Sequence, residues 1–247
     1  MARYKVILAY DGTAFHGSQR QRGARTVQGE FEAALRQLGW TGRTVLLAGR
    51  TDAGVHAEGQ VAAFDLPWRH SAQDLRNALN ALLPPDLSVR QARQCAPDFH
   101  PRYDARARTY HYRVLVDAAP HPLKERYAWR VHPQPDMRLL QHLAAQLRGE
   151  HDFAAFGRPM RKGGSTRRTV MAARWYHLPD YLLFEITANA FLYHMVRRLV
   201  YVQVMTALGR LSPQTVVRHL EQPGERPLQG LAPAAGLSLV SVTYERE

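Results

Sequence analysis

The residues from Ala48 to His56, Ala-Gly-Arg-Thr-Asp-Ala-Gly-Val-His, are the clearest candidates for chemistry in this chain. Asp52 stands near the middle of the stretch, between Gly49 and Gly54. Glycine lets a backbone approach a ligand closely, so a bulky group could lie directly against this loop. A carboxylate held there can act as a nucleophile that forms a covalent intermediate. Asp and Gly are also common in hairpin turns, so Asp-Ala-Gly alone would favour a simple turn.

The nine residues together resemble the signature motif of the pseudouridine synthases, most closely that of the bacterial tRNA pseudouridine synthase A branch. In that family the aspartate of the motif is the nucleophile, so the resemblance assigns this role to Asp52. Further segments match in the same order and extend the resemblance over essentially the full chain: Tyr10-Asp11-Gly12 with Gln19-Arg20-Gln21, Arg-Thr-Tyr-His-Tyr at 108–112, Asn189–Arg197 and Gly236-Leu237.

The resemblance implies that the protein isomerises uridine to pseudouridine in the anticodon stem-loop of tRNA, where relatives act at positions 38 to 40. This reaction breaks the N1–C1′ bond, turns the uracil and rejoins it through C5. Nothing is oxidised, hydrolysed or phosphorylated, so we expect no cofactor. The target uridine must be flipped out of its stack and held against an aromatic or apolar wall.

The resemblance also assigns residues to the uridine site. Tyr110 is the tyrosine that lies against the uracil, and its hydroxyl could also remove a proton. Leu237 is the apolar residue beneath the base, and Arg50 touches phosphate or enters the disrupted RNA. A tyrosine on a strand is usually a core residue, which is the interpretation that we favour for Tyr112.

Arg197 is the expected partner of Asp52. It lies beside Arg198 in a segment whose apolar residues cover most of a helix circumference, so we expect this helix to be buried. An unpaired charge inside a protein is very costly, and the resemblance selects Arg197 to pair with the aspartate. A positive neighbour would keep the Asp52 carboxylate ionised and oriented in a cleft. The alternative is a structural ion pair that only holds the two halves together.

The composition favours a polyanionic partner. The 247 residues include 33 Lys and Arg against 21 Asp and Glu, which gives a net charge of +12. Neutralising nucleic-acid phosphates releases counterions and drives binding. Lysine occurs only three times, so most of this charge is arginine, whose planar group suits phosphates and base edges. Codon bias in a GC-rich genome would enrich arginine in the same way.

Two polar segments, 11–25 and 158–168, carry much of the basic charge. Basic and aromatic residues together suit RNA, although each segment could also be a solvated surface loop. The resemblance favours the RNA-binding role, with Gln19 and Arg20 as contacts to the substrate. Ser18 stands where relatives usually have tryptophan, which argues against a stacking role at that position.

Two other classes of function compete with the isomerase. An RNA-binding module without catalysis would fit the basic loops, but it would leave a pairing of Asp52 with Arg197 without purpose. An aspartate-nucleophile hydrolase of small molecules would use Asp52, but the net charge of +12 argues against it.

The periodicity of apolar residues predicts the elements that position these side chains. In the first half, strands and helices alternate in the order β-α-β-β-α-β, which is the split βαβ unit of ferredoxin-like domains. The second half roughly repeats this order with insertions. The expected strands are 3–10, the pair around Asp52, 87–93, 109–116, 170–177, 181–187 and 237–244. The expected helices are 27–38 with Thr26 as its cap, 71–83, 136–147, 190–208 with Asn189 as its cap, and one from Pro213.

We therefore expect an α+β protein of two ferredoxin-like halves, with a central mixed or antiparallel sheet and an active-site cleft between the halves. The resemblance implies that these halves form the pseudouridine-synthase fold. Residues 1–105 would carry the catalytic aspartate loop, and residues 106–247 would complete the cleft. The resemblance also implies a homodimer, with which an apolar face within residues 170–208 would be consistent.

The chain offers few signs of other chemistry. Cys95 is the sole cysteine, so no intramolecular disulfide can form, which favours the cytoplasm, and we expect Cys95 to be a buried packing residue. The sequence has no H-E-x-x-H motif or paired C-x-x-C motifs, so we expect no metal. No apolar run approaches the length needed to cross a bilayer, so we expect no membrane partner.

Overall fold

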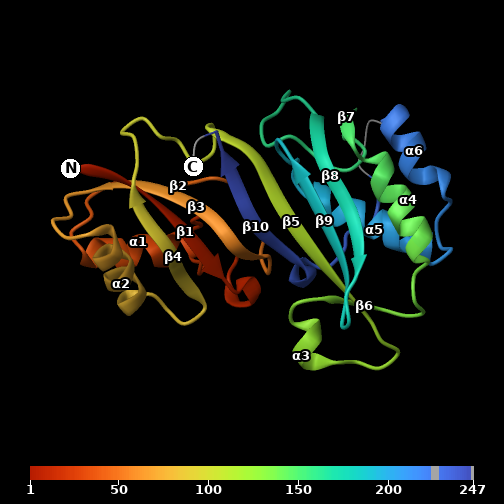
Figure 1. Cartoon of the computed structure of the whole chain (residues 1–247), viewed down its shortest axis with the longest axis horizontal. Helices are drawn as coiled ribbons and strands as arrows, with labels where there is room; N and C mark the ends of the chain where they lie inside the picture. Colours follow the sequence, from red (N-terminus) through yellow and green to blue (C-terminus); the bar gives the residue numbers. More distant parts are fainter. Residues whose placement is uncertain (224–227, 246–247) are drawn as a thin grey trace. The chain divides into compact units, whose positions relative to one another are not determined.

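The computed structural model describes residues 1–223 and 228–245, and the chain divides into two compact units. The first unit holds Met1–Arg106 together with Ser238–Glu247, and the second holds Ala107–Leu237. Each unit combines a mostly antiparallel sheet with helices (Figure 1). This confirms the expected α+β class.

The first unit has the expected order β-α-β-β-α-β, closed by a strand from the end of the chain. Its elements are β1 (Ala2–Tyr10), η1 (Gly12–Ala14), α1 (Val27–Gln37), β2 (Leu46–Leu47), β3 (His56–Leu66), α2 (Ala72–Leu82), β4 (Leu87–Gln94) and β10 (Leu237–Tyr244). The strands lie in the order β4-β1-β3-β10, and β2 pairs with β3. β1 runs antiparallel to β3 and β4, whereas β10 pairs in parallel with the start of β3.

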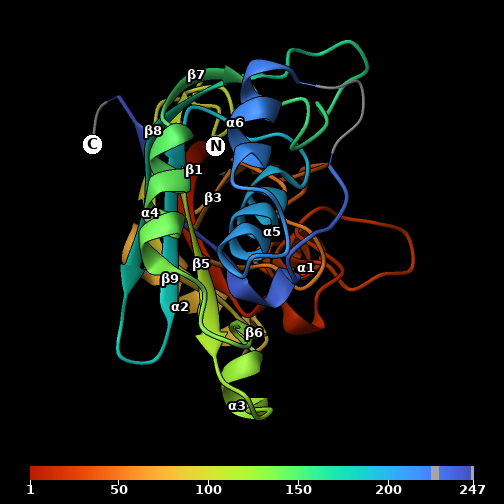
Figure 2. The same cartoon turned by 90° about the vertical axis from the view of Figure 1, so that its right-hand side faces the viewer.

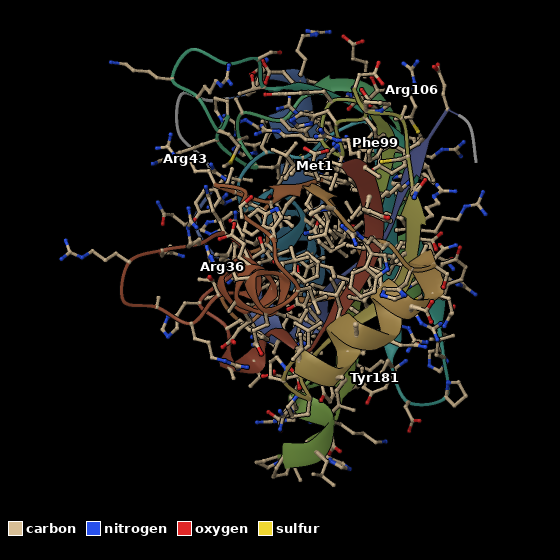
Figure 3. The ribbon with its side chains drawn as sticks, turned by 90° about the vertical axis from the view of Figure 1, so that its left-hand side faces the viewer. Met1, Arg36, Arg43, Phe99, Arg106 and Tyr181 are labelled. Carbon is tan, nitrogen blue, oxygen red and sulfur yellow. The ribbon has the colours of Figure 1, made fainter. Side chains whose placement is uncertain are left out.

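Aromatic side chains fasten α1 to this sheet. The Phe31 ring of α1 meets the Phe64 ring of β3 at 5.7 Å, and Phe64 stacks on Tyr4 of β1 at 6.1 Å. Thr26 caps α1 as predicted, because its side chain accepts from the N–H of Gly29. Arg36, which lies in the last turn of α1, is labelled in Figure 3.

The second unit has a sheet in the order β5-β9-β8-β7, with β6 parallel to β5. Its elements are β5 (Ala105–Val116), α3 (Pro122–Glu125), β6 (Trp129–Val131), α4 (Met137–Gln146), β7 (Gly149–Asp152), β8 (Arg167–His177), β9 (Leu182–Ala188), α5 (Met195–Ala207), α6 (Gln214–Glu221) and η2 (Ala234–Gly236). α4, α5 and α6 pack against one another (Figure 2). Trp175 of β8 donates to Gln203 of α5 at 3.0 Å, so α5 covers the apolar face of this sheet.

The helix that the sequence predicts from Ala190 begins later, at Met195. The predicted cap, Asn189, instead accepts from the N–H groups of Thr169 and Ala190. His194 precedes the helix with a φ of 66°, in the left-handed region. A residue in that region breaks a right-handed helical path, so the residues before it cannot belong to α5. The apolar residues of α5 are buried as expected: Val196, Leu199, Val200, Val202, Val204 and Met205.

The division into units differs from the predicted halves at both ends of the second unit. The first unit extends to Arg106, inside β5, and residues 238–245 return to it although their position in the sequence suggested the second half. They return because Ser238 and Leu239 pair with His56 and Ala57 of β3. The short elements α3, β6 and β7 were not predicted. Within the described part of the chain, no helix combines the length and apolar character that a membrane span requires.

Candidate active site

Asp52 lies in a tight turn between β2 and β3. The N–H of Val55 donates to the carbonyl oxygen of Asp52 at 3.2 Å, and Gly54 has a φ of 78°. Glycine adopts this region without strain, so the turn requires the glycine that follows Asp52 by two residues. Asp52 is half-buried, whereas Arg50 is exposed.

Residues 12–18 hold this turn and are named here the cradle segment. Three N–H groups join the two: Gly54 to the oxygen of Phe15 at 3.3 Å, Ser18 to the oxygen of Thr51 at 3.0 Å, and Gly12 to Nδ1 of His56 at 3.0 Å. The backbones approach so closely that a Cβ on Gly12 would lie 2.0 Å from the oxygen of Val55. The turn is therefore fixed on both sides of Asp52.

Two arginines that follow the cradle segment, Arg20 and Arg25, have acidic partners. Arg20 donates to Glu32 at 2.5 Å, and the side chain of Glu32 is fully buried, so Arg20 compensates an internal charge. Arg25 binds both oxygens of Asp86 at 2.7 and 2.8 Å, which lowers the pKa of the Asp86 carboxyl. Gln19 is exposed. Substrate binding by Gln19 and Arg20 stays a prediction.

In the second unit, the segment 228–237 forms hydrogen bonds with residues of both α5 and β5. Arg197 donates from Nε to the oxygen of Ala232 at 2.8 Å, and the N–H of Ala232 donates back to the oxygen of Arg197 at 3.2 Å. Tyr112 donates to the oxygen of Pro233 at 2.8 Å. Leu237 lies four residues after Pro233, just beyond η2, and is only 6% exposed. The structure thus gathers Arg197 and Leu237 at the same connecting segment, next to β5.

Two tyrosines of β5 point to the same side of the strand. Tyr112 is fully buried, as expected of a core residue, and burial raises the pKa of its hydroxyl although the nearby Arg197 charge opposes the rise. Tyr110 is also buried, at 8% exposure, and its ring meets Phe191 edge to face with 5.1 Å between centroids. Phe191 thus orients the tyrosine that we expect at the uracil.

Arg198 explains how α5 carries two adjacent arginines. Both are half-buried, and Arg198 donates to the oxygen of Leu228 at 2.7 Å and to that of Phe156 at 2.9 Å. Burial lowers the pKa of the Arg198 guanidinium, as do the nearby charges of Arg158 and Arg197. Both guanidinium groups thus donate hydrogen bonds to backbone carbonyl oxygens. The apolar pattern of the helix does not reveal these partners.

The basic side chains at positions 161–168 differ in whether they are exposed or already bonded within the protein. Arg161 and Lys162 are exposed at a turn with Gly163, whose φ is 73°. Arg167 pairs with Glu150 at 2.8 Å, and Arg168 is half-buried and donates to the oxygen of Ser165 at 2.9 Å. The first pair is therefore the better candidate for phosphate contacts.

The candidate residues fall into both units. Asp52, Arg50, Gln19 and Arg20 belong to the first unit, and Tyr110, Arg197 and Leu237 to the second. The pairing of Asp52 with Arg197 stays a prediction. Among residues 1–223 and 228–245, no cluster of three or more His, Cys, Asp and Glu side chains could hold a metal ion.

Several residues that serve the Asp52 turn were not predicted. Ser18 and Gln60 are fully buried and Tyr10 is 5% exposed, and all three bond to residues 49–51. A polar residue inside an apolar strand, as Gln60 is, was the available signal. Ser18 gave none, because its partner lies 33 residues away.

Comparison with known proteins gives consistent matches. A family model described as tRNA pseudouridine synthase matches residues 6–104 and 143–245. A protein of Limosilactobacillus fermentum is 38% identical over 250 residues, with 99% of this chain and 97% of the relative covered. One of Chloroflexus aurantiacus is 39% identical, with 99% and 89% covered, and one of Thermosipho melanesiensis is 38% identical, with 99% and 100% covered. Each relative is named tRNA pseudouridine synthase A.

Proposed function

The chain belongs to the tRNA pseudouridine synthase family, and we propose that it isomerises uridine at positions 38 to 40 of the anticodon stem-loop with Asp52 as nucleophile. As a member it is an isomerase of tRNA uridine with the α+β fold of pseudouridine synthases. The assignment of Asp52 as the nucleophile is supported by the cradle segment, which fixes the backbone on both sides of this half-buried carboxylate. A nucleophile must be held in a near-attack geometry to act efficiently.

The proposed reaction leaves the composition of the nucleotide unchanged, since uridine and pseudouridine are isomers. The N1–C1′ bond breaks, the uracil turns, and a C5–C1′ bond forms. The hydrogen on C5 leaves as a proton, and N1 ends the reaction protonated. Asp52 can serve by adding to C1′, by adding to C6 or by promoting elimination, and each route uses the same ionised carboxylate.

The residues of the second unit are proposed to hold the freed uracil. Tyr110 supplies an aromatic face that Phe191 orients, and Leu237 supplies an apolar surface. The Tyr110 hydroxyl oxygen is the candidate to take up the C5 proton as the hydroxyl releases its own proton to solvent water. Exposed basic residues such as Arg161 and Lys162, with the net charge of +12, support binding of tRNA phosphates.

A release assay tests the function directly. The chain is incubated with tRNA that carries tritium at C5 of its uridines, and tritium released to water is counted. We expect release from tRNA with uridine at positions 38 to 40, and none when those positions are cytidine. Asp52→Asn is the control for a contaminating activity. Release that persists without uridine at 38 to 40 would contradict the proposed sites, and no release from any tRNA would contradict the isomerase.

A further inference from the structure

Thr51, the residue before Asp52, is held at each of its polar groups. It is 7% exposed, and its N–H, carbonyl oxygen and hydroxyl all have partners within the first unit. The Thr51 carbonyl and the Asp52 N–H belong to one planar peptide group. Fixing Thr51 therefore sets the plane from which the Asp52 side chain departs.

Ser18 binds both backbone groups of Thr51. Its Oγ accepts from the N–H of Thr51 at 2.8 Å, and its own N–H donates to the oxygen of Thr51 at 3.0 Å. Ser18 is itself anchored, because its oxygen accepts from the N–H of Gln28 in α1 at 2.9 Å. A fully buried serine thus connects α1 rigidly to the peptide that leads into Asp52.

Tyr10 holds the side chain of the same threonine. Its hydroxyl lies 2.8 Å from Oγ1 of Thr51, and burial raises the pKa of this hydroxyl, so it stays protonated. Gln60 donates from Nε2 to the oxygen of Gly49 at 2.9 Å and lies 3.5 Å from the Tyr10 hydroxyl. The far side of the turn is thereby tied to β1 and β3.

We infer that Ser18 and Tyr10 are positioning residues for Asp52, acting through Thr51. This inference rests on the proposed role of Asp52. Neither side chain is invoked in bond making or proton transfer. Their effect should therefore fall on the chemical step and leave tRNA binding nearly unchanged. Misplacing a reacting group by about 1 Å can cost on the order of 100-fold in rate.

The test compares single-turnover rates with tRNA affinity in the full-length chain. Ser18→Ala should lower the rate of pseudouridine formation by about 10–100-fold. Tyr10→Phe, which retains the ring, should lower it by less, and both variants should bind tRNA within about two-fold of wild type. Ser18→Thr retains the hydroxyl and should recover most of the rate. Ser71→Ala removes the same hydroxyl from the cap of α2 and controls for lost stability, since Ser71 accepts from Asp74 and lies outside the cradle segment.

Each possible result of these measurements either supports or overturns the positioning role of Ser18 and Tyr10. Slow chemistry with normal binding in Ser18→Ala, together with recovery in Ser18→Thr, supports it. Wild-type rates in both Ser18→Ala and Tyr10→Phe overturn it while the proposed function stands. An equal loss of rate in Ser71→Ala, at a matched fall in melting temperature, overturns it in favour of general destabilisation. A wild-type chain that forms no pseudouridine overturns the proposed function and the inference with it.

Discussion

At the scale of single residues, the charge of Asp52 is what the proposed chemistry depends on. Asp52→Asn is nearly isosteric and removes that charge, so we expect it to bind tRNA within a few fold of wild type and to form no pseudouridine. Binding is measured by filter retention and product by tritium release. Turnover of a few per cent, with deamidation of the new asparagine excluded by mass spectrometry, would show that Asp52 is not the nucleophile.

Tyr110 has two proposed roles that predict different results for the same change. If it acts only as a wall, Tyr110→Phe keeps the ring and most of the activity, and Tyr110→Ala loses about ten- to a hundredfold, since stacking contributes roughly 1–3 kcal/mol per base. If the hydroxyl accepts the proton, Tyr110→Phe alone should lose on the order of 10²–10⁴ in the chemical step. We expect Tyr110→Phe to be severely slow in single turnover while still binding tRNA. A rate equal to wild type would leave Tyr110 as a wall.

The sequence could predict the residues that a motif names, and not those that support them. Asp52 and Gly54 stand out because both belong to the nine-residue motif Ala48–His56, and the turn needs the positive φ of Gly54. Ser18 does not stand out, because its contact with Thr51 exists only once two distant segments have packed together.

At the scale of elements, Arg197 joins α5 to residues 228–237. Arg197→Ala removes the hydrogen bond from a charged group to the oxygen of Ala232, which should destabilise the protein by about 1.5–3 kcal/mol. Arg197→Lys keeps the charge and should recover less than charge alone suggests, because the planar donor group is lost. Thermal unfolding and single-turnover rates measure the two effects.

If Arg197 also pairs with Asp52, the double variant Asp52→Asn/Arg197→Lys should destabilise less than the sum of the two single changes. Strict additivity would leave Arg197 as a structural residue of the second unit. Normal melting and normal turnover of Arg197→Ala would contradict both roles.

The basic segment 158–168 is expected to act as an element that grips phosphate. If Arg161 and Lys162 each contact one phosphate, replacing both with Ala should make the slope of log Kd against log salt less steep by about 1.8 on duplex RNA-like stems. The matched control is Arg138→Ala/Arg148→Ala, which removes one exposed charge in α4 and one just after it. An unchanged slope in the first variant, or an equal change in the control, would show that the segment is a solvated surface loop without a specific role in phosphate binding.

Elements with a strong apolar period were predicted closely, and those defined by tertiary contacts were not. Thr26 and Pro213 mark helix starts as expected, because caps and proline act locally. The start of α5 was misplaced because His194 takes a left-handed conformation that its residue type does not announce. β7 was missed because a glycine and three polar residues, without apolar alternation, join the sheet by pairing with β8.

At the scale of the whole molecule, a homodimer remains our expectation. β8 and the turn after it expose apolar side chains that water solvates poorly: Met171 is 49%, Tyr176 37% and Leu178 39% exposed. Light scattering should give about twice 28.0 kDa for the wild type. Replacing Met171 and Tyr176 with Asp should give a monomer, whereas Leu123→Asp, at an 81% exposed site in α3, should not. A monomeric wild type would contradict the dimer.

The return of β10 to the first unit has a consequence for biosynthesis. Leu239 follows its partner Ala57 by 182 residues, so the ribosome must translate most of the chain before β3 gains this neighbour. At about 5–20 residues per second, the interval is roughly 10–35 s. Throughout it, the start of β3 presents an open strand edge, which is a template for pairing with other nascent chains. The unit that carries Asp52 therefore begins first on the ribosome and gains its last strand only after the second unit has been translated.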